Sequence, residues 1–259
     1  MALSALVLVR CFGFCRLDFS QNLSGRPDPY IVLNDTKPLH PHSDLIAKKV
    51  NAPLRPRGFA LWCAGDLSLV KKPCVAVVGA RQVSTSGAAR ARRLARELSQ
   101  SGVVVVSGLA LGVDTEALTA ALEARGRTIA VIGTPIDKAY PAENKRLQEL
   151  IYGEHLLISQ FPPGKKTYPS NFPERNKLMA AISDATVIVE ASDTSGSLHQ
   201  AAECLKLNRW LFIAKSVLED RTLQWPSKFT HYPKTRPHNV TDDILSALSI
   251  REPSGTRMS

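Results

Sequence analysis

The chain has 259 residues, enough to bury a sizeable hydrophobic core as one large domain or one domain with extensions. Its hydrophobic share of 44% excludes a wholly disordered chain, and no segment is long and apolar enough to suggest a membrane span or a membrane partner. The formal net charge of +10 favours polyanionic partners, although basic charge is also common on ordinary globular proteins.

The cysteines and the first residues indicate the compartment. Only Cys11 and Cys15 lie close together among five cysteines, and no further Cys or His follows at zinc-ligand spacing. We therefore expect no metal site, and reduced structural thiols in a cytoplasmic protein. The apolar start, Met1–Val9, lacks a basic lead and a small-residue cleavage site, so we expect a buried helix or strand there rather than a signal peptide.

Residues 1–60 differ in pattern from the rest of the chain. Prolines interrupt every long periodic segment, so we expect an irregular N-terminal extension with extended or loosely helical structure. These prolines are Pro27, Pro29, Pro38, Pro41, Pro53 and Pro56.

From Cys74 onward, short apolar runs alternate with helical patterns, as in a parallel sheet built from βα units. The expected strands are apolar throughout rather than alternating, which indicates burial on both faces. We predict an α/β fold over residues 61–216, a Rossmann-like doubly wound, mostly parallel sheet with helices on both faces. The strands are expected at Val75–Val78, Val103–Val106, Thr128–Ile132, Leu156–Ser159, Thr186–Glu190 and Trp210–Ala214, and the helices at 86–100, 114–125, 142–152, 173–183 and 196–207.

The pattern weakens beyond residue 216. The stretch Leu218–His238 carries Trp225 and several prolines and is expected to be irregular. One last helix is expected at Asp242–Leu248, followed by a loose tail. Residues 217–259 are therefore interpreted as a C-terminal extension.

Small residues and hydrogen-bond donors follow four of the predicted strands. Open α/β sheets bind ligands at the carboxyl ends of their strands, and glycine there allows a phosphate to approach backbone N–H groups at a helix start. Arginine can hold a phosphate with two hydrogen bonds. Tight βα turns also use Gly and Ser, so a purely structural role stays open. The candidate phosphate-binding residues at these turns are Gly79, Arg81, Ser84, Ser107, Gly108, Gly112, Ser195, Gly196 and Ser197.

The turns do not match the common nucleotide-cofactor motifs. Gly79 and Gly87 are too far apart for a dinucleotide fingerprint, and the second strand is followed by Ser107 rather than by an acidic residue. The sequence also contains no Gly-Lys-Ser/Thr loop of the Walker type. We therefore expect no cofactor.

The segment Phe172–Lys177 opens a predicted helix, with Pro173 in its first turn. Cations at a helix N-terminus are repelled by the macrodipole, so their presence here suggests a bound anion or an acidic neighbour. Upstream, two lysines lie beside Tyr168, a combination suited to stacking bases and following a backbone, although a solvated loop explains it equally well. The further candidate binding residues are Lys165, Lys166, Arg175, Asn176 and Lys177.

Three carboxylates accompany these turns. Asp114 is interpreted as the N-cap of its helix, with turning of the Ser107–Gly112 loop towards a ligand as a second role, and Glu190 as a residue that orients Arg81 or Arg175. No carboxylate pair has an obvious catalytic spacing and no His lies beside a candidate nucleophile, so we predict a binding protein without catalytic residues. The alternative is a nucleotide-binding or nucleotide-hydrolysing Rossmann-like enzyme or sensor, in which Asp114, Glu190 or Asp193 supplies the acid or base. A protein–protein adaptor is a third alternative.

Five blocks of the sequence, taken in order, resemble the DprA/Smf family of DNA-processing proteins. The resemblance runs from about residue 60 to residue 214 and is carried by VAVVGAR (75–81), VSGLALGVDTEA (106–117), GRTIAVIGTPIDKAYPAEN (126–144), FPERNKLMAAIS (172–183) and VIVEASDTSGSLHQAA (187–202).

The resemblance implies a Rossmann-like, nonenzymatic protein that binds single-stranded DNA, forms a homodimer and helps to load a RecA-type recombinase during natural transformation or recombination. By the same resemblance, Arg81 and the Ser107–Gly108 turn would hold DNA phosphate, and the residues around Arg175 and Ser195 would complete the pocket. The chain departs from the family pattern at Leu118, Pro135, Lys177 and Lys215–Ser216, where His, Gly, Arg and Pro-Gly are usual.

Overall fold

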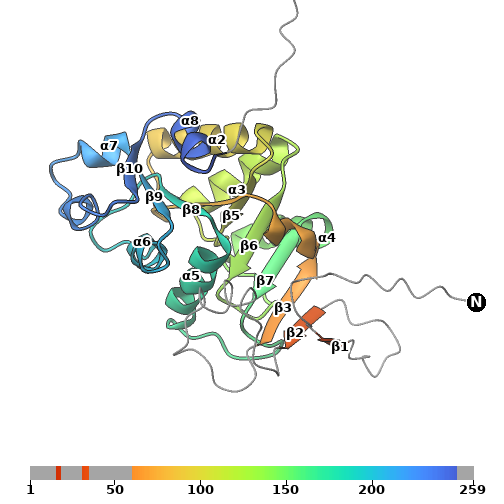
Figure 1. Ribbon diagram of the computed structural model, residues 1–259. Helices are drawn as coiled ribbons and strands as arrows, with labels where there is room; N and C mark the ends of the chain where they lie inside the picture. The colour runs from red at the N-terminus through yellow and green to blue at the C-terminus, as the bar shows by residue number, and fades with distance from the viewer. Residues whose placement is uncertain (1–15, 19–30, 35–59, 250–259) are drawn as a thin grey trace, which may run out of the picture.

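The computed structural model describes residues 16–18, 31–34 and 60–249. The predictions for Met1–Val9, for Cys11 and Cys15, and for most of the N-terminal extension lie outside these residues. Within them, a twisted central sheet carries helices on both of its faces (Figure 1).

Ten strands of the described residues form one sheet, in the order β1-β2-β3-β7-β6-β5-β4-β8-β9-β10. Strands β4 to β10 pair parallel with one another, whereas β1, β2 and β3 add an antiparallel edge beside β7. The strands are β1 (Arg16–Asp18), β2 (Ile31–Asn34), β3 (Ala60–Gly65), β4 (Cys74–Val78), β5 (Val104–Ser107), β6 (Thr128–Ile132), β7 (Leu156–Ser159), β8 (Ala185–Ile188), β9 (Trp210–Ala214) and β10 (Thr235–His238).

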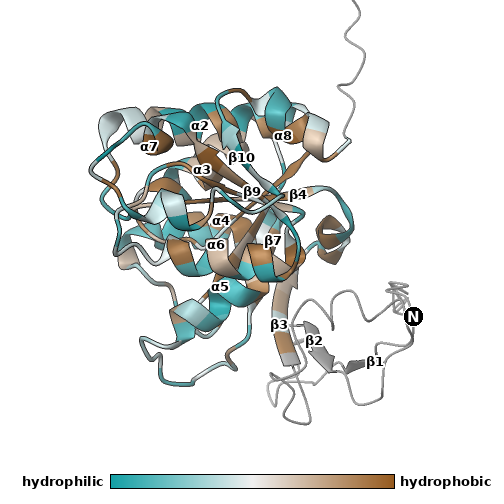
Figure 2. Cartoon of the chain, turned by 60° about the vertical axis from the view of Figure 1, so that its left-hand side comes forward, coloured by the Kyte–Doolittle hydropathy of each residue, from teal (hydrophilic) through white to brown (hydrophobic). Residues whose placement is uncertain are grey.

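Helices cover both faces of the parallel strands, as Figure 2 shows with the sheet between two helical layers. In β4, Ala76 and Val78 face the core beneath α5 and α6, whereas Val75 and Val77 face the core beneath α2, α3 and α8. The predicted doubly wound α/β fold is therefore confirmed. The helices are α2 (Thr85–Gln100), α3 (Val113–Glu123), α4 (Lys145–Glu154), α5 (Asn171–Ile182), α6 (Ser197–Lys206), α7 (Lys215–Leu218) and α8 (Thr241–Ala247).

Helix α2 illustrates how local sequence sets an element. The Ser84 hydroxyl accepts a hydrogen bond from the backbone N–H of Gly87 at 3.0 Å, a cap that stabilises a helix by about 1 kcal/mol. Leu94 and Leu98 lie on its buried face, and burying each leucine contributes about 1.5–3 kcal/mol. The helix ends before Gly102, which adopts a positive φ of 75°.

The segment beyond residue 216 is more ordered than the sequence suggests. Strand β10 lies within the stretch expected to be irregular and pairs with β9, while α8 confirms the last predicted helix. Trp225 is fully buried, and its indole N–H donates to the carbonyl oxygen of Ala191 at 3.0 Å. The domain boundaries at residues 60 and 216 stay predictions.

The strand order places a crevice at the centre of the sheet. Strands β5, β6 and β7 lie on one side of β4, and β8, β9 and β10 lie on the other. Chain connections on the two sides lead away from each other, so the carboxyl ends of β4 and β8 border an opening where such folds bind ligands. Among the described residues, no helix has both the length and the apolar character that crossing a membrane requires.

Candidate nucleic-acid interface

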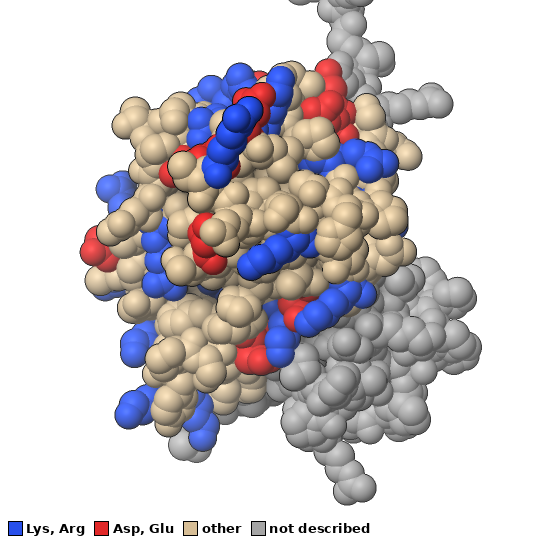
Figure 3. Space-filling view, turned by 90° about the vertical axis from the view of Figure 1, so that its left-hand side faces the viewer, with Lys and Arg blue, Asp and Glu red and all other residues tan. Residues whose placement is uncertain are grey.

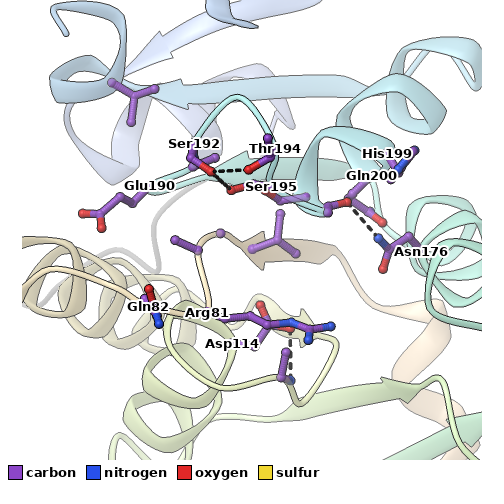
Figure 4. Close-up of a pocket in the computed structure, with 18 of the residues that line it drawn as sticks. Arg81, Gln82, Asp114, Asn176, Glu190, Ser192, Thr194, Ser195, His199 and Gln200 are labelled. Atoms are coloured by element: carbon purple, nitrogen blue, oxygen red, sulfur yellow. Dashed lines mark hydrogen bonds between the residues drawn. The ribbon is translucent and has the colours of Figure 1, made fainter. Parts of the chain in front are cut away.

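A pocket of about 960 Å³ lies at this crevice. Its walls come from the ends of β4 and β8 and from the first turns of α2, α5 and α6 (Figure 4). Eight of the fourteen candidate residues line it, which are Gly79, Arg81, Ser84, Arg175, Asn176, Ser195, Gly196 and Ser197. Candidate residues that were predicted from separate segments of the sequence therefore lie together in one pocket.

The turn after β4 packs tightly against the end of β8. The N–H of Ala80 donates to the carbonyl oxygen of Glu190 at 2.7 Å. A Cβ added to Gly79 would lie 2.6 Å from that oxygen and 2.6 Å from a methyl group of Val113, so only glycine fits there. Because the backbone at Gly79 packs so closely here, Arg81, two residues further along the chain, lies at the pocket.

Arg81 is the cation that the pocket leaves available. It is exposed, and it forms no ion pair with any residue that the structure describes. Its guanidinium carbon lies 5.7 Å from the centroid of the Phe172 ring. Figure 4 shows the side chain of Arg81 projecting into the pocket opposite the loop that carries Ser192, Thr194 and Ser195. A free guanidinium in this position can donate to an anion.

Arg175 lines the same pocket but is 5% exposed and bonded to the backbone. Its Nη1 atom donates to the carbonyl oxygen of Val131 at 2.7 Å and also to that of Gly108. Burial lowers the pKa of Arg175, and nearby Asp114 opposes that shift. Arg175 thus joins the ends of β5 and β6 beneath the pocket, and its predicted contact with phosphate stays a prediction.

Asp114 organises the loop after β5. The interpretation of Asp114 as a helix N-cap is wrong, because α3 begins after Gly112 as its N-cap. One carboxylate oxygen of Asp114 instead accepts the N–H groups of Gly108 at 3.1 Å and Ala110 at 3.3 Å. Burial raises the pKa of Asp114, whereas Arg175 and these N–H donors oppose the rise. Asp114 and Arg175 together form the floor of the pocket.

Glu190 holds the start of α2. Its carboxylate accepts the backbone N–H of Ser84 at 2.8 Å and the hydroxyl of Ser84 at 2.6 Å. It also forms an ion pair with Arg90 at 3.2 Å. Glu190 therefore pairs with Arg90 rather than with Arg81 or Arg175 as expected, and Ser84 is engaged in capping. The sequence analysis missed Arg90, which lies about one helical turn beyond Gly87 on the same side of α2.

The start of α6 brings a helix N-terminus and an unpartnered hydroxyl to the pocket. Its N-cap, Gly196, has no side chain with which to cap the helix. Ser197 is 8% exposed, and its hydroxyl has no hydrogen-bond partner among the described residues. The amide of Asn176 donates to the carbonyl oxygen of Gly196 at 3.2 Å and ties α5 to this turn. An open helix N-terminus with a free hydroxyl favours an anion.

Three candidate residues lie near the pocket but have structural contacts with the segments around it. The hydroxyl of Ser107 is buried and donates to the carbonyl oxygen of Val77 at 2.7 Å, joining β5 to β4. Gly108 lies against Arg175, whose guanidinium leaves no room for a Cβ. Gly112 has a φ of 76°, and its Cβ position would lie 2.3 Å from the carbonyl oxygen of Ala80. Their contacts with a ligand stay predictions.

The three candidate lysines lie outside the pocket lining. Lys177 pairs with Glu174 at 2.7 Å, so an acidic neighbour accompanies this cation in the first turns of α5. Lys165 and Lys166 lie in the loop between β7 and α5, and the Lys166 ammonium lies 5.7 Å from the ring centroid of Tyr168. Whether these lysines contact DNA stays a prediction.

An aromatic pair at the rim escaped the sequence analysis as a binding feature. The Tyr140 ring is 46% exposed and lies 5.5 Å from the Phe172 ring at an interplanar angle of 43°. Phe172 in turn lies beneath Arg81 and lines the pocket. Exposed aromatic rings beside a cation can stack bases. The sequence feature that could have indicated this pair was Tyr140, in the block that follows β6.

The fold defines a Rossmann-like α/β protein, and its crevice holds an exposed arginine and a helix N-terminus in place of a dinucleotide fingerprint. The family described as DNA recombination-mediator protein A matches residues 43–248. The chain belongs to that family.

Two curated relatives agree with this assignment. The DNA processing protein DprA of Streptococcus pneumoniae is 42% identical over 160 residues, which cover 61% of this chain and 56% of that protein. The DNA processing protein DprA of Bacillus subtilis is 34% identical over 169 residues, which cover 65% of this chain and 57% of that protein. The chain therefore spans little more than half the length of these relatives.

Solved structures give the same fold. The X-ray structure of DNA processing protein A from S. pneumoniae superposes with a TM-score of 0.66 at 36% identity, over 72% of this chain and 65% of that one. DNA processing protein A from Helicobacter pylori, solved to describe its single-stranded DNA binding mode, superposes with a TM-score of 0.67 at 30% identity. That match covers 78% of this chain and 92% of the H. pylori chain.

Proposed function

We propose that this chain is a DNA-processing protein that binds single-stranded DNA, with the sugar-phosphate backbone held between Arg81 and the start of α6. One observation carries the proposal: the pocket combines an unpaired arginine with an uncapped helix N-terminus and the free hydroxyl of Ser197. A phosphate diester supplies the negative charge and the acceptor oxygens that these groups lack. Family membership and the single-stranded DNA binding of the H. pylori protein support the same ligand.

The rim favours a single strand over a duplex. Unpaired bases can stack on exposed rings, whereas paired bases are hidden within the helix. Tyr140 offers such a ring, packed against the half-buried Phe172 beneath Arg81, and Tyr168 offers another beside Lys166. We include Lys165, Lys166 and Lys177 in the proposal as outer contacts with the backbone.

Binding without catalysis fits the chemistry of the pocket better than nucleotide hydrolysis. A general acid or base needs a carboxylate free to reach the substrate. Asp114 is bonded to loop N–H groups and Glu190 to Ser84 and Arg90. The described residues also contain no group of three or more Asp, Glu, His or Cys arranged to hold a metal ion. The homodimer, the RecA-type recombinase partner and the cytoplasmic location stay predictions.

The proposal is tested by fluorescence anisotropy with labelled oligothymidylate and with a duplex of the same length. We expect the single strand to bind more tightly. Arg81→Ala should lose about 1.5–3 kcal/mol of binding free energy, a roughly ten-fold to hundred-fold rise in Kd. The slope of log affinity against log salt should fall by about 0.7, the value for one phosphate contact in a single strand.

Arg146→Ala is the matched control, because Arg146 is an exposed arginine on α4 outside the pocket lining. Equal binding by the Arg81 and Arg146 variants at every salt concentration would refute the proposal. A thermal shift with mononucleotides, accompanied by product formation and by no shift with oligonucleotide, would favour the hydrolase instead.

A further inference from the structure

A second cavity, of about 280 Å³, continues from the pocket along the same edge of the sheet. Arg90 and Ser216 line both cavities, so the two share a wall and follow each other. The second cavity lies between α2 and the carboxyl ends of β9 and β10, with Lys215 and His238 at those strand ends. The groove therefore passes the ends of β4, β8, β9 and β10 in turn.

Cations outnumber carboxylates along this continuation. Arg90, Arg93 and Lys215 line it, against Glu97 and Glu219. Glu97 already accepts a hydrogen bond from the hydroxyl of Thr241. Arg93 lies 3.9 Å from the Glu97 carboxylate and Arg90 pairs with Glu190, so each cation of this lining has an acidic partner and reaches a ligand by exchanging that partner.

Of these cations, Lys215 can most readily exchange its carboxylate partner for a ligand. Its ammonium lies 3.6 Å from the Glu219 carboxylate, and the two side chains are 58% and 64% exposed. Exposed pairs of this kind contribute little to stability, so a phosphate can replace the carboxylate at small cost.

We propose that the single strand held at Arg81 continues past Arg90 and Ser216 into this second cavity, where Lys215 and Arg93 contact a further phosphate. The inference rests on the proposed function and extends it, because it assigns a longer binding track and a direction across β8, β9 and β10. Cations spread along a groove suit an extended polyanion better than a single small anion, which needs convergent donors.

The test compares oligothymidylates of about 4 and about 16 nucleotides, which bracket the usual site sizes of single-strand binders. Lys215→Ala should weaken binding of the long oligonucleotide about three-fold to ten-fold and lower its salt slope by about 0.7. Binding of the short oligonucleotide, which the Arg81 pocket accommodates, should stay unchanged. Lys215→Glu should exceed the alanine effect on the long oligonucleotide.

Lys145 provides a closely matched control. Like Lys215, it is the first residue of a helix and forms an exposed i,i+4 pair, here with Glu149 at 3.9 Å. Lys145→Ala and Lys145→Glu should bind both lengths like the parent chain.

Each outcome separates the two proposals. Equal binding of the long oligonucleotide by the Lys215 and Lys145 variants, with weak binding by Arg81→Ala, would overturn the extended track and leave the proposed function standing. An equal loss at both lengths for Lys215→Ala would also overturn it, since Lys215 would then belong to the first pocket. If the parent chain binds neither oligonucleotide, the proposed function fails and the track with it.

Discussion

Arg81 and Arg175 both line this pocket but have different physical roles. Arg81 follows a predicted strand, and Arg175 follows the predicted start of a helix. Arg81 is exposed and unpaired among the described residues, whereas Arg175 is buried and bonded to the carbonyl oxygens of Gly108 and Val131. A sequence shows that both are arginines after Gly or Pro turns. Which one is buried depends on the loop after β5, where Gly108 lies 67 residues from Arg175 along the chain.

This difference predicts that alanine substitution lowers stability strongly at Arg175 and hardly at Arg81. Arg175→Ala leaves Asp114 as an uncompensated buried carboxylate and removes donors from two carbonyl oxygens, at a cost of about 3–5 kcal/mol. Thermal unfolding should show a Tm lower by about 6–20 °C. Arg81→Ala should stay within about 0.5 kcal/mol of the parent chain. A larger loss of stability for the Arg81 variant would contradict these assignments.

The described cysteines should be unreactive in the folded protein. Cys63, Cys74 and Cys204 are buried, and burial raises the pKa of Cys74 and of Cys204 to about 12. Both thiols therefore remain protonated at neutral pH, and the thiolate is the reactive form. Alkylation followed by peptide mass spectrometry should label these two residues only after denaturation. Rapid labelling of Cys74 or Cys204 under native conditions would show that this core opens.

At the scale of elements, the turn before α3 supports the backbone that carries Arg81. Gly112 has a positive φ, and a Cβ there would lie 2.3 Å from the carbonyl oxygen of Ala80 and 2.4 Å from that of Arg81. Gly112→Ala should therefore lower both the Tm and the affinity for single-stranded DNA, because the backbone at Arg81 must move.

Gly153→Ala is the control for that substitution. Gly153 lies in α4, and nothing lies within 4 Å of its Cβ position. Replacing a helical glycine by alanine in open space should stabilise the protein by about 0.5–1 kcal/mol and leave DNA affinity unchanged. Gly112→Ala with parent-like stability and affinity would contradict the proposed coupling between this turn and Arg81.

The sequence predicted most of the sheet because apolar runs report burial on both faces. Strand β10 was missed because Thr235–His238 has no apolar run, contains Pro237 and joins the sheet only through backbone pairing with β9. The contact of Asp114 with the Ser107–Gly112 loop was predicted only as a second role, and the partners of Glu190 were missed, for a related reason. Each carboxylate bonds N–H groups or arginines whose positions depend on how loops fold, which residue type and spacing do not reveal.

At the scale of the whole molecule, net charge gives little guidance to the site. The formal charge is +10, but on the face shown in Figure 3 basic and acidic groups alternate with wide uncharged areas. The pocket lining itself holds three arginines and three carboxylates. Two arginines are paired with carboxylates or buried beside one, so the proposed affinity depends on Arg81 and on the start of α6 rather than on a broad basic field.

Hydrogen–deuterium exchange with and without oligothymidylate can locate the bound strand on the protein. Amides that lose solvent access and gain a phosphate acceptor exchange more slowly. We expect protection on DNA binding in peptides covering 79–84 and 195–199, with no change in α4 at 145–154. Protection confined to other surfaces, with both pocket segments unchanged in a DNA-bound sample, would show that DNA does not bind at Arg81 and the start of α6.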